Sequence, residues 1–326
     1  MIKTSKILVT DPIHPDAILR LTQEGFEVVE LPEEKKGQLP DLIEPYHALI
    51  CRTSTVLDTP TLSRATNLTC IALASTGFDR IDMEEATRRN VSVLGLPSYN
   101  IDIDPERDGN FVSTAEHAIL LILASLGDFY HACQSMKEGC WEKKFLVGHE
   151  LAHKTVGLLG LGRIATLVAR RLSSFRVKII SYDPYVSKEK AEKLEVELVS
   201  EDDLYRQSDI ISIHVPRTKE TEGMVNAEKF ALMKDGVFIV NTARAAIMDE
   251  KALINALRNK KVCRASIDVF HDEPNKINSN LVKLPNVIAT PHIGGSTHEA
   301  WRRISLSAAD NIISFFQGNI RNKLNQ

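Results

Sequence analysis

The fold is decided by ten residues, Val156-Gly157-Leu158-Leu159-Gly160-Leu161-Gly162-Arg163-Ile164-Ala165. Gly160, Gly162 and Ala165 match the pattern Gly-x-Gly-x-x-Gly/Ala. In this pattern the first glycine makes a tight turn, the second lets the backbone approach a pyrophosphate, and the third small residue lets helix and strand pack closely. The pattern follows an apolar strand and opens a helical stretch, so a pyrophosphate would lie on a helix N-terminus. It therefore predicts a dinucleotide-binding domain.

A second strand, ending at Ser181-Tyr182-Asp183-Pro184, supports this interpretation. It ends about 20 residues beyond the glycines, where an acid that binds the ribose hydroxyls is expected. A carboxylate there accepts hydrogen bonds from those hydroxyls and repels a 2′-phosphate, which predicts NAD rather than NADP. Asp183 could instead be a plain turn residue before Pro184.

Short apolar runs alternate with amphipathic stretches along the chain, which indicates parallel sheets with both faces covered by helices. The expected strands cover residues 6–10, 26–31, 48–51, 70–73, 91–94, 155–159, 178–181, 210–213, 237–240 and 287–289, with a further short strand at 265–266. Helices are expected over residues 15–24, ended by Gly25, and over 163–172 and 297–317. Ser113-Thr114-Ala115-Glu116 is typical of a capping box ahead of an apolar helix over 118–126.

We therefore expect an α/β fold of two doubly wound parallel-sheet domains, which also fits a length of 326 residues. Residues 1–110 and 297–326 would form one domain, because the last helix is expected to return to the N-terminal half. Residues 111–296 would form the nucleotide-binding domain.

Composition excludes several other classes. The formal net charge of -3 leaves no electrostatic footprint for nucleic acid. The opening residues hold no apolar run long enough for a secretory signal, and no stretch approaches the ~20 residues of a membrane span, so we expect a cytoplasmic protein without membrane contact. The five cysteines include no Cys-x2-Cys pair. We expect reduced thiols, mostly packed as small hydrophobes, and no metal site.

Three polar segments follow predicted strands, and they carry residue types suited to keto-acid chemistry. They are Asn241-Thr242-Ala243-Arg244, residues 267–274, and Thr290-Pro291-His292-Ile293-Gly294-Gly295-Ser296. Hydride transfer to a 2-keto acid needs a proton donor at the carbonyl, and His titrates near neutral pH. It also needs a cation for the carboxylate, which the planar guanidinium of Arg binds in a bidentate manner. Because ligands bind beyond the carboxyl ends of strands in open α/β sheets, we expect the three segments to share one crevice.

These segments, with Gly160-Leu161-Gly162-Arg163-Ile164, resemble the signature blocks of the D-isomer-specific 2-hydroxyacid dehydrogenases in order and approximate spacing over nearly the whole chain. The resemblance implies a Rossmann nucleotide domain, a flavodoxin-like substrate domain, and NAD-dependent interconversion of a D-2-hydroxy acid and its 2-keto acid. It implies that Arg244 binds and polarises the substrate and that His292 is the acid/base. Glu273 would pair with His292 and keep its imidazole protonated for donation.

The resemblance also implies a set of cofactor contacts, with Asp268 meeting the nicotinamide carboxamide. The set is Gly160, Gly162, Arg163, Ile164, Asp183, His214, Pro216, Thr221, Thr242, Ala243, Asp268, His292, Gly294 and Gly295. A lone histidine is usually structural, so we expect His271 and His298 to be surface residues and His117 an ordinary helix residue.

On the substrate side, Arg52-Thr53-Ser54-Thr55 and Ala74-Ser75-Thr76-Gly77-Phe78-Asp79 resemble substrate loops of the family, and Asn110 fits a family asparagine. The implied substrate contacts are Arg52, Thr53, Thr76, Gly77, Asn110 and Arg244. Arg52 could meet a phosphate. These blocks favour the phosphoglycerate dehydrogenases within the family.

Three features depart from that group. Leu73 stands where some members carry an Arg, and the chain ends shortly after its last helix, so serine feedback through a further domain is not expected. Residues 98–109 form an insertion, either a solvated loop or a lid.

Three functions remain open. The first is a 3-phosphoglycerate dehydrogenase. The second is a glyoxylate/hydroxypyruvate reductase or another 2-keto acid reductase. The third, a NAD-sensing scaffold like the corepressors that share this fold, is disfavoured by the intact Arg244, Glu273 and His292 set. A homodimer through the apolar helix from Val112 and the segment to Trp141 is expected by analogy, although that helix could instead be core.

Overall fold

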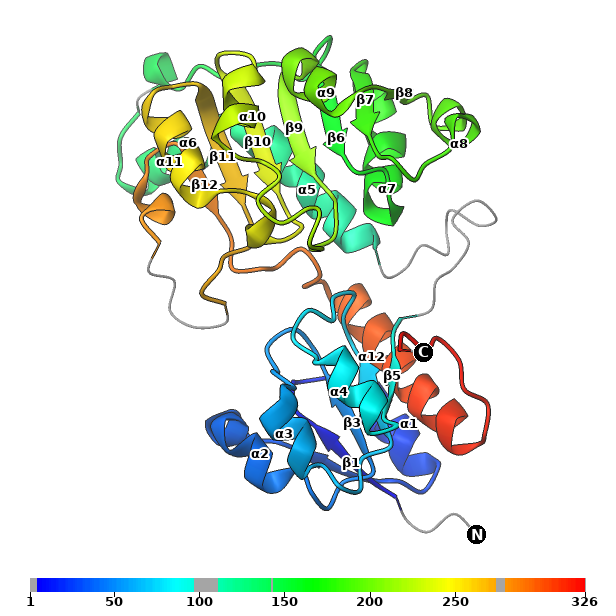
Figure 1. The fold of residues 1–326 in the computed structure, drawn as a ribbon. Coiled ribbons are helices and arrows are strands. Elements are labelled where there is room, and N and C mark those ends of the chain that lie inside the picture. The colour runs from blue at the N-terminus through cyan, green and yellow to red at the C-terminus, as the bar shows by residue number, and fades with distance from the viewer. Residues whose placement is uncertain (1–4, 97–110, 142, 274–278, 326) are drawn as a thin grey trace. The chain divides into compact units, whose positions relative to one another are not determined.

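The computed structural model describes residues 5–96, 111–141, 143–273 and 279–325. The chain divides into two compact units, which we call unit 1 (Met1–Asn110 with Ser296–Gln326) and unit 2 (Phe111–Gly295). Each unit has its own parallel sheet with helices on both faces (Figure 1). The α/β fold with two doubly wound parallel sheets, expected from the sequence, is confirmed.

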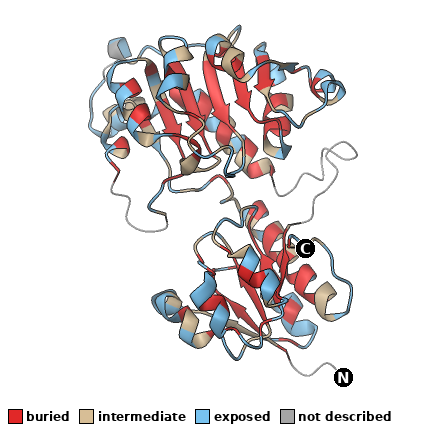
Figure 2. Cartoon of the chain, viewed as in Figure 1, coloured by how far each residue is buried: buried red, intermediate tan, exposed pale blue. Residues whose placement is uncertain are grey.

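Unit 1 has the flavodoxin-like strand order β2-β1-β3-β4-β5. Its strands are β1 (Lys6–Val9), β2 (Glu27–Glu30), β3 (Ala48–Cys51), β4 (Cys70–Leu73) and β5 (Ser92–Leu94). Its α-helices are α1 (Pro15–Gln23), α2 (Leu39–Leu42), α3 (Thr59–Arg64), α4 (Met83–Arg88) and α12 (His298–Phe316). The central strands β3 and β4 are buried along their whole length, as expected for strands covered on both faces (Figure 2).

Local sequence signals explain where the covering helices begin and end. Pro15 occupies the first turn of α1, where its missing N–H removes no helical bond. Gly25 follows the helix at φ +89°, a left-handed conformation that ends it. The Thr297 side chain caps α12 by accepting from the N–H of Ala300. The helix α12 packs against α1 and β4 in unit 1, which confirms its expected return.

Unit 2 has the strand order β12-β11-β10-β9-β6-β7-β8, which is the Rossmann order with one added strand. Its strands are β6 (Thr155–Leu159), β7 (Lys178–Tyr182), β8 (Glu197–Leu198), β9 (Ile210–Ile213), β10 (Val237–Asn241), β11 (Val262–Ile267) and β12 (Val287–Ala289). Its α-helices are α5 (Val112–Leu126), α6 (Phe129–Lys137), α7 (Arg163–Leu172), α8 (Lys188–Lys193), α9 (Glu201–Gln207), α10 (Ala227–Leu232) and α11 (Glu250–Arg258). The strand order reverses between β6 and β9, beside the glycine-rich loop.

Two local expectations were wrong. The helix α5 begins at Val112 with Phe111 as its N-cap, so Ser113 lies inside the first turn and makes no cap. Burial of Phe111 and Ala115 in the core extends the helix towards its N-terminus and leaves the Ser113 hydroxyl without a partner among the described residues. The strand β11 is longer than the expected 265–266, because the charged Arg264 interrupts the apolar run in the sequence. In the structure its side chain instead donates to the Ser125 carbonyl at 2.6 Å.

The cysteines are all free, but only Cys51 and Cys70 are buried, while Cys140 and Cys263 are exposed. The expectation that most pack as small hydrophobes was therefore wrong.

Among the described residues, no single helix has the length and apolar character to cross a membrane, although the bent pair α5 and α6 together would pass by length and composition alone.

Candidate active site

The three polar segments follow the carboxyl ends of three neighbouring strands in the unit 2 sheet. In the parallel register, Asn241 of β10 lies beside Ile267 of β11, and Ile267 lies beside Ala289 of β12. The pairing continues past the strands, because the N–H of Asp268 donates to the Asn241 carbonyl (2.9 Å) and the N–H of Thr290 donates to the Ile267 carbonyl (3.0 Å). The loops that carry Arg244, Glu273 and His292 therefore start side by side, as the strand positions predict.

His292 and Glu273 form a direct contact across two of these loops. The Nδ1 of His292 lies 2.6 Å from the Oε2 of Glu273, and both side chains are partly buried. The other carboxylate oxygen of Glu273 accepts from the N–H of Phe270 at 2.6 Å, which fixes its orientation. An Nδ1–H that donates to Glu273 leaves Nε2 as the nitrogen that can exchange a proton with a ligand.

Arg244 is oriented through its backbone by the last residue of β10. The buried side chain of Asn241 accepts from the N–H of Ala243 (3.0 Å) and donates to the carbonyl of Arg244 (3.0 Å). The Nη1 of Arg244 also donates to the Ala243 carbonyl at 2.7 Å. A guanidinium carries five N–H donors in a planar fork, and that geometry matches the two oxygens of a carboxylate.

Asp268 lies between these loops with its side chain 1% exposed. Its carboxylate accepts from the backbone N–H groups of Ile293 and Gly294, both at 2.9 Å, and from the Thr290 hydroxyl at 2.6 Å. The side chain thus holds the loop that carries His292, a role that the sequence did not indicate. His117, expected to be an ordinary helix residue, contacts this same carboxylate. His271 and His298 are exposed, as expected.

The glycine-rich loop has the geometry of an anion cradle. Gly160 has φ +88°, and a Cβ there would lie 2.8 Å from the Cγ1 of Val215. Gly162 is the N-cap of α7 without a side-chain cap, and nothing lies within 4 Å of where its Cβ would be. The space beside Gly162 at the N-terminus of α7 is therefore open, which leaves room for a pyrophosphate. The guanidinium of Arg163 lies over the Phe111 ring, 4.3 Å from its centre.

Asp183 stands at the end of β7, where a ribose-binding acid is expected. One carboxylate oxygen accepts from the N–H of Leu161 in the glycine-rich loop (2.8 Å), and the other accepts from the N–H of Tyr185 (2.9 Å). Asp183 thus forms a turn before Pro184, as the alternative interpretation of the sequence had it. It also ties the end of β7 to the glycine-rich loop. Each oxygen retains a lone pair for a further donor.

The remaining candidates lie at or after the ends of β9 and β10. His214 is bonded to the Ser212 hydroxyl (2.9 Å), and burial lowers the pKa of its imidazole to about 4. The hydroxyl of Thr221 donates to the carbonyl of Pro216 at 2.5 Å. The hydroxyl of Thr242 is buried and has no partner among the described residues. An orphaned hydroxyl at this edge and the open N-terminus of α7 both fit a bound dinucleotide.

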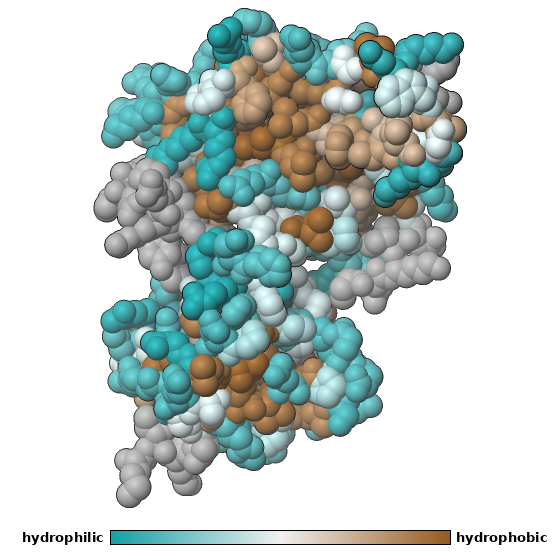
Figure 3. Space-filling model, turned by 180° about the vertical axis from the view of Figure 1, so that it is seen from behind, coloured by the Kyte–Doolittle hydropathy of each residue, from teal (hydrophilic) through white to brown (hydrophobic). Residues whose placement is uncertain are grey.

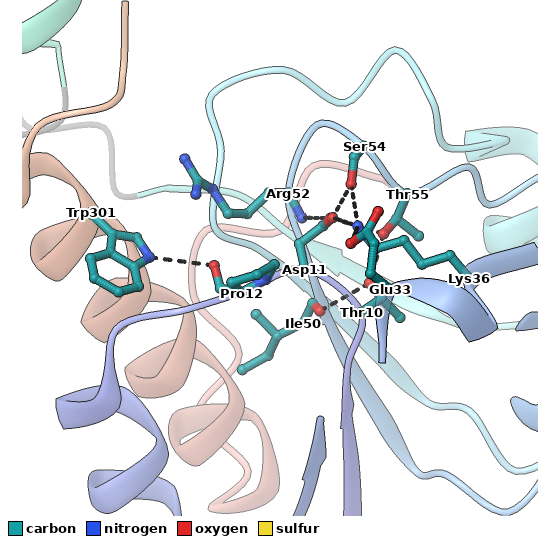
Figure 4. A network of polar contacts seen from close by, with 10 residues as sticks. All are labelled: Thr10, Asp11, Pro12, Glu33, Lys36, Ile50, Arg52, Ser54, Thr55 and Trp301. Carbon is teal, nitrogen blue, oxygen red and sulfur yellow. Dashed lines mark hydrogen bonds and ion pairs between the residues drawn. The ribbon is translucent and has the colours of Figure 1, made fainter. Parts of the chain in front are cut away.

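The loop after β3 in unit 1 is organised by a buried carboxylate (Figure 4). The side chain of Asp11 accepts from the N–H of Arg52 (2.6 Å), the hydroxyls of Ser54 and Thr55, and the ammonium of Lys36 (2.9 Å). Burial alone would raise the pKa of Asp11, but the bonds from Ser54, Lys36 and Arg52 outweigh it and the pKa is lowered. No motif in the sequence indicated this role for Asp11.

The guanidinium of Arg52 itself makes no hydrogen bond to these residues. Figure 4 shows it pointing away from Asp11 towards the side where Trp301 lies. Burial lowers the pKa of this guanidinium, and the nearby charge of Asp11 offsets that effect only in part. Among the described residues it bonds no acidic side chain, so it is available to an anion.

The loop after β4, the strand next to β3, holds Thr76 and Gly77. The hydroxyl of Ser75 donates to the Gly77 carbonyl at 2.9 Å, while Thr53 and Thr76 are exposed. These loops start at the same sheet edge, because the N–H of Ala74 donates to the Cys51 carbonyl at 2.8 Å. Asn110 and the insertion at residues 98–109 lie outside the described residues.

A family model described as "D-isomer specific 2-hydroxyacid dehydrogenase, NAD binding domain" matches residues 119–294. A D-3-phosphoglycerate dehydrogenase of Archaeoglobus fulgidus is 41% identical over 98% of this chain, which spans 59% of that relative's length. A hydroxypyruvate reductase of Thermotoga maritima is 40% identical over 94% of this chain and 97% of its own length.

Solved structures with a similar fold include an enzyme with its cofactor bound. The NAD-dependent formate dehydrogenase of Staphylococcus aureus in complex with NAD is 28% identical and has a TM-score of 0.85, with 97% of each chain covered.

The two glycines of the loop should separate folding from cofactor binding. Gly160→Ala should lower the melting temperature, because a side chain at positive φ costs about 1–3 kcal/mol and this one also meets Val215. Gly162→Ala should keep the melting temperature and weaken NADH binding, because its Cβ enters the space over the N-terminus of α7. Thermal melting and NADH fluorescence titration measure the two effects. Unchanged NADH affinity in Gly162→Ala would show that no pyrophosphate lies there.

Proposed function

The chain belongs to the D-isomer specific 2-hydroxyacid dehydrogenase family, and we propose that it interconverts 3-phosphoglycerate and its 2-keto acid with NAD. The observation that carries the proposed chemistry is the contact between His292 and Glu273 on loops that start beside the Arg244 loop. The 3-phosphoglycerate assignment would give the protein a role in serine biosynthesis. A cytoplasmic location stays a prediction from the sequence.

Each residue has a distinct task in the proposed reaction. Arg244 binds the substrate carboxylate through its guanidinium fork and draws electron density from the neighbouring carbonyl. In reduction, the Nε2–H of His292 protonates the carbonyl oxygen; in oxidation, Nε2 removes the proton from the hydroxyl. Glu273 accepts from Nδ1 at 2.6 Å, which holds the ring in one orientation and stabilises the charged imidazolium.

NAD supplies or accepts the hydride when it is bound. The residues proposed to hold it are the glycine-rich loop with Arg163 and Ile164, Asp183 at the ribose, and Thr242 with the buried hydroxyl. His214, Pro216, Thr221, Ala243, Asp268, His292, Gly294 and Gly295 complete the proposed contacts, with Asp268 proposed to meet the nicotinamide carboxamide. A carboxylate at position 183 would repel a 2′-phosphate, so we propose NAD rather than NADP.

The first test measures NADH oxidation with 3-phosphohydroxypyruvate, hydroxypyruvate, glyoxylate and pyruvate. His292→Ala should lower kcat by about 10²–10⁴-fold, because the proton donor is lost, while NADH binding is kept. The matched control is His298→Ala, which removes an exposed imidazole six residues further along the chain. Retained turnover in His292→Ala would remove that residue from the mechanism. Tight NADH binding without turnover of any substrate would favour a NAD-sensing scaffold.

The substrate proposal rests on Arg52. A partly buried guanidinium that bonds no acidic side chain among the described residues suits a phosphate, and the carboxylate of Asp11 fixes the backbone of this residue. Thr53, Thr76, Gly77 and Asn110 are proposed to hold the substrate with it. The second candidate function is a hydroxypyruvate reductase, because the relative matched over 97% of its length carries that name.

Removing the Arg52 charge should separate these two candidates. Arg52→Gln should raise KM for 3-phosphohydroxypyruvate about 10–100-fold, the equivalent of one charge-assisted hydrogen bond, and leave KM for hydroxypyruvate nearly unchanged. Arg20→Gln is the matched control, since Arg20 is an exposed arginine of unit 1 that pairs with Asp310. An equal rise for both substrates would mean that Arg52 does not meet the phosphate, and the reductase would then be favoured.

We also propose that the protein is a homodimer through unit 2. Several large apolar side chains of α5 and α6 are exposed, and the space-filling view from behind shows apolar residues gathered on this unit (Figure 3). The exposed residues are Leu120, Leu123, Phe129, Tyr130 and Met136, with Trp141 just beyond α6. Contiguous apolar surface of this kind commonly marks an interface. The other face of α5 is buried in the core, so the helix has the core role considered from the sequence, and its exposed face is the part proposed for the interface.

A charge on this surface should dissociate the dimer. Leu120→Glu should give a monomer in light scattering after size exclusion, because a buried carboxylate without a partner opposes association. Leu19→Glu on α1 is the matched control, because Leu19 is 57% exposed and Leu120 is 56% exposed. A monomeric wild-type protein, or a dimeric Leu120→Glu variant, would contradict the proposal.

A further inference from the structure

The loop Thr290–Gly294 has an unusual backbone that must be held from outside. His292 has φ +53°, in the left-handed region, which side chains other than glycine adopt with strain. Its N–H donates to the carbonyl of Asp268 at 2.9 Å, while the Asp268 carboxylate accepts from Thr290, Ile293 and Gly294. The position of the imidazole therefore depends on how firmly Asp268 is fixed.

Asp268 is a buried anion, so it is stable only while its donors are in place. Burial alone would raise its pKa, but the bonds from His117, Thr290 and Ile293 outweigh that effect and the pKa is lowered. Thr290 and Ile293 belong to the loop that Asp268 holds. Of the three donors, His117 alone comes from a different element, the helix α5.

His117 reaches both the carboxylate and the loop. Its Nε2 lies 3.3 Å from the Oδ1 of Asp268 and 3.3 Å from the Oγ1 of Thr290, and its side chain is 9% exposed. A Cβ on Gly294 would lie 3.6 Å from the Cδ2 of His117, so the ring also packs beside the loop backbone. The helix that carries it is anchored by Ala115 and Ala118, which are fully buried in the unit 2 core.

We propose that His117 is a positioning residue, which with Asp268 fixes the loop that presents His292 to the substrate. The inference rests on the proposed role of His292 and adds a residue from a remote helix to that site. Reacting groups must be held within about 0.5 Å of their productive geometry, so a loop that loses an outside anchor loses catalytic rate before it loses cofactor affinity.

Two variants of similar size test the contact. His117→Leu fills the space without a donor, whereas His117→Gln retains an amide N–H at about the position of Nε2, from which it can reach Asp268. We expect His117→Leu to lower kcat about 10–100-fold, with a smaller change in KM for NADH; this is the range found when hydrogen-bond partners of metal ligands are lost. His117→Gln should recover most of that rate. Hydrogen exchange at the amides of Ile293 and Gly294 should be faster in His117→Leu and near normal in His117→Gln.

Ser125→Ala is the matched control. The Ser125 hydroxyl lies on the same helix and bonds the Ser266 hydroxyl of β11 at 2.6 Å, so its loss weakens the docking of α5 without touching the loop. Ser125→Ala should keep kcat and the exchange rates of the loop. Equal losses in Ser125→Ala and His117→Leu, or wild-type kcat in His117→Leu, would overturn the proposal.

The exchange measurement separates this inference from the proposed function. If the wild-type enzyme turns over no 2-keto acid, the proposed function fails, yet faster exchange of Ile293 and Gly294 in His117→Leu still supports the anchoring of the loop. Unchanged exchange at both amides would overturn the role of His117 whatever the activity of the enzyme.

Discussion

Three neighbouring parallel strands, β10, β11 and β12, end side by side, and the whole polar arrangement of unit 2 depends on that register. Asn241, Ile267 and Ala289 are the last residues of these strands and lie next to one another. A slip of one residue would turn every side chain of a strand to the opposite face. Core packing fixes the register: β10 is buried along its whole length, so a slip would bring side chains of the wrong size against the tightly packed residues on each face.

Asp268 fixes the loops that this register brings together. It is the first residue after β11, the middle strand of the three, and its carboxylate reaches the loop after β12. A buried carboxylate is tolerated only when hydrogen bonds compensate it, so the donors and the loop backbone constrain one another. The left-handed conformation of His292 persists because these bonds specify it. Such a loop is already ordered before a ligand arrives, which is the arrangement that favours rate.

The sequence predicted features that depend on neighbouring residues, and it missed those that depend on residues far away in the chain. Strands such as Ala48–Cys51 and the helix Arg163–Leu172 were predicted with the bounds that the structure has, because apolar periodicity and glycine chemistry are local. Family resemblance, not periodicity, suggested the roles of Arg244, Glu273 and His292. The part played by His117 was not predictable, since it lies 173 residues from Thr290 in the chain and nothing near it marks the contact. The wrong capping box at Ser113 has a similar cause, because core packing moved the start of the helix.

Unit 1 also contains a buried carboxylate that holds a neighbouring loop. Asp11 lies two residues beyond β1, is 3% exposed, and holds the loop after β3 by accepting from the N–H of Arg52. The charge of Asp11 is compensated by Lys36 and by two hydroxyls rather than by the guanidinium of the loop it holds. Because those donors satisfy the carboxylate, Arg52 is fixed in place through its backbone without being neutralised through its side chain. An anion that reaches this loop therefore meets a guanidinium that forms no ion pair with Asp11, the residue that positions its backbone.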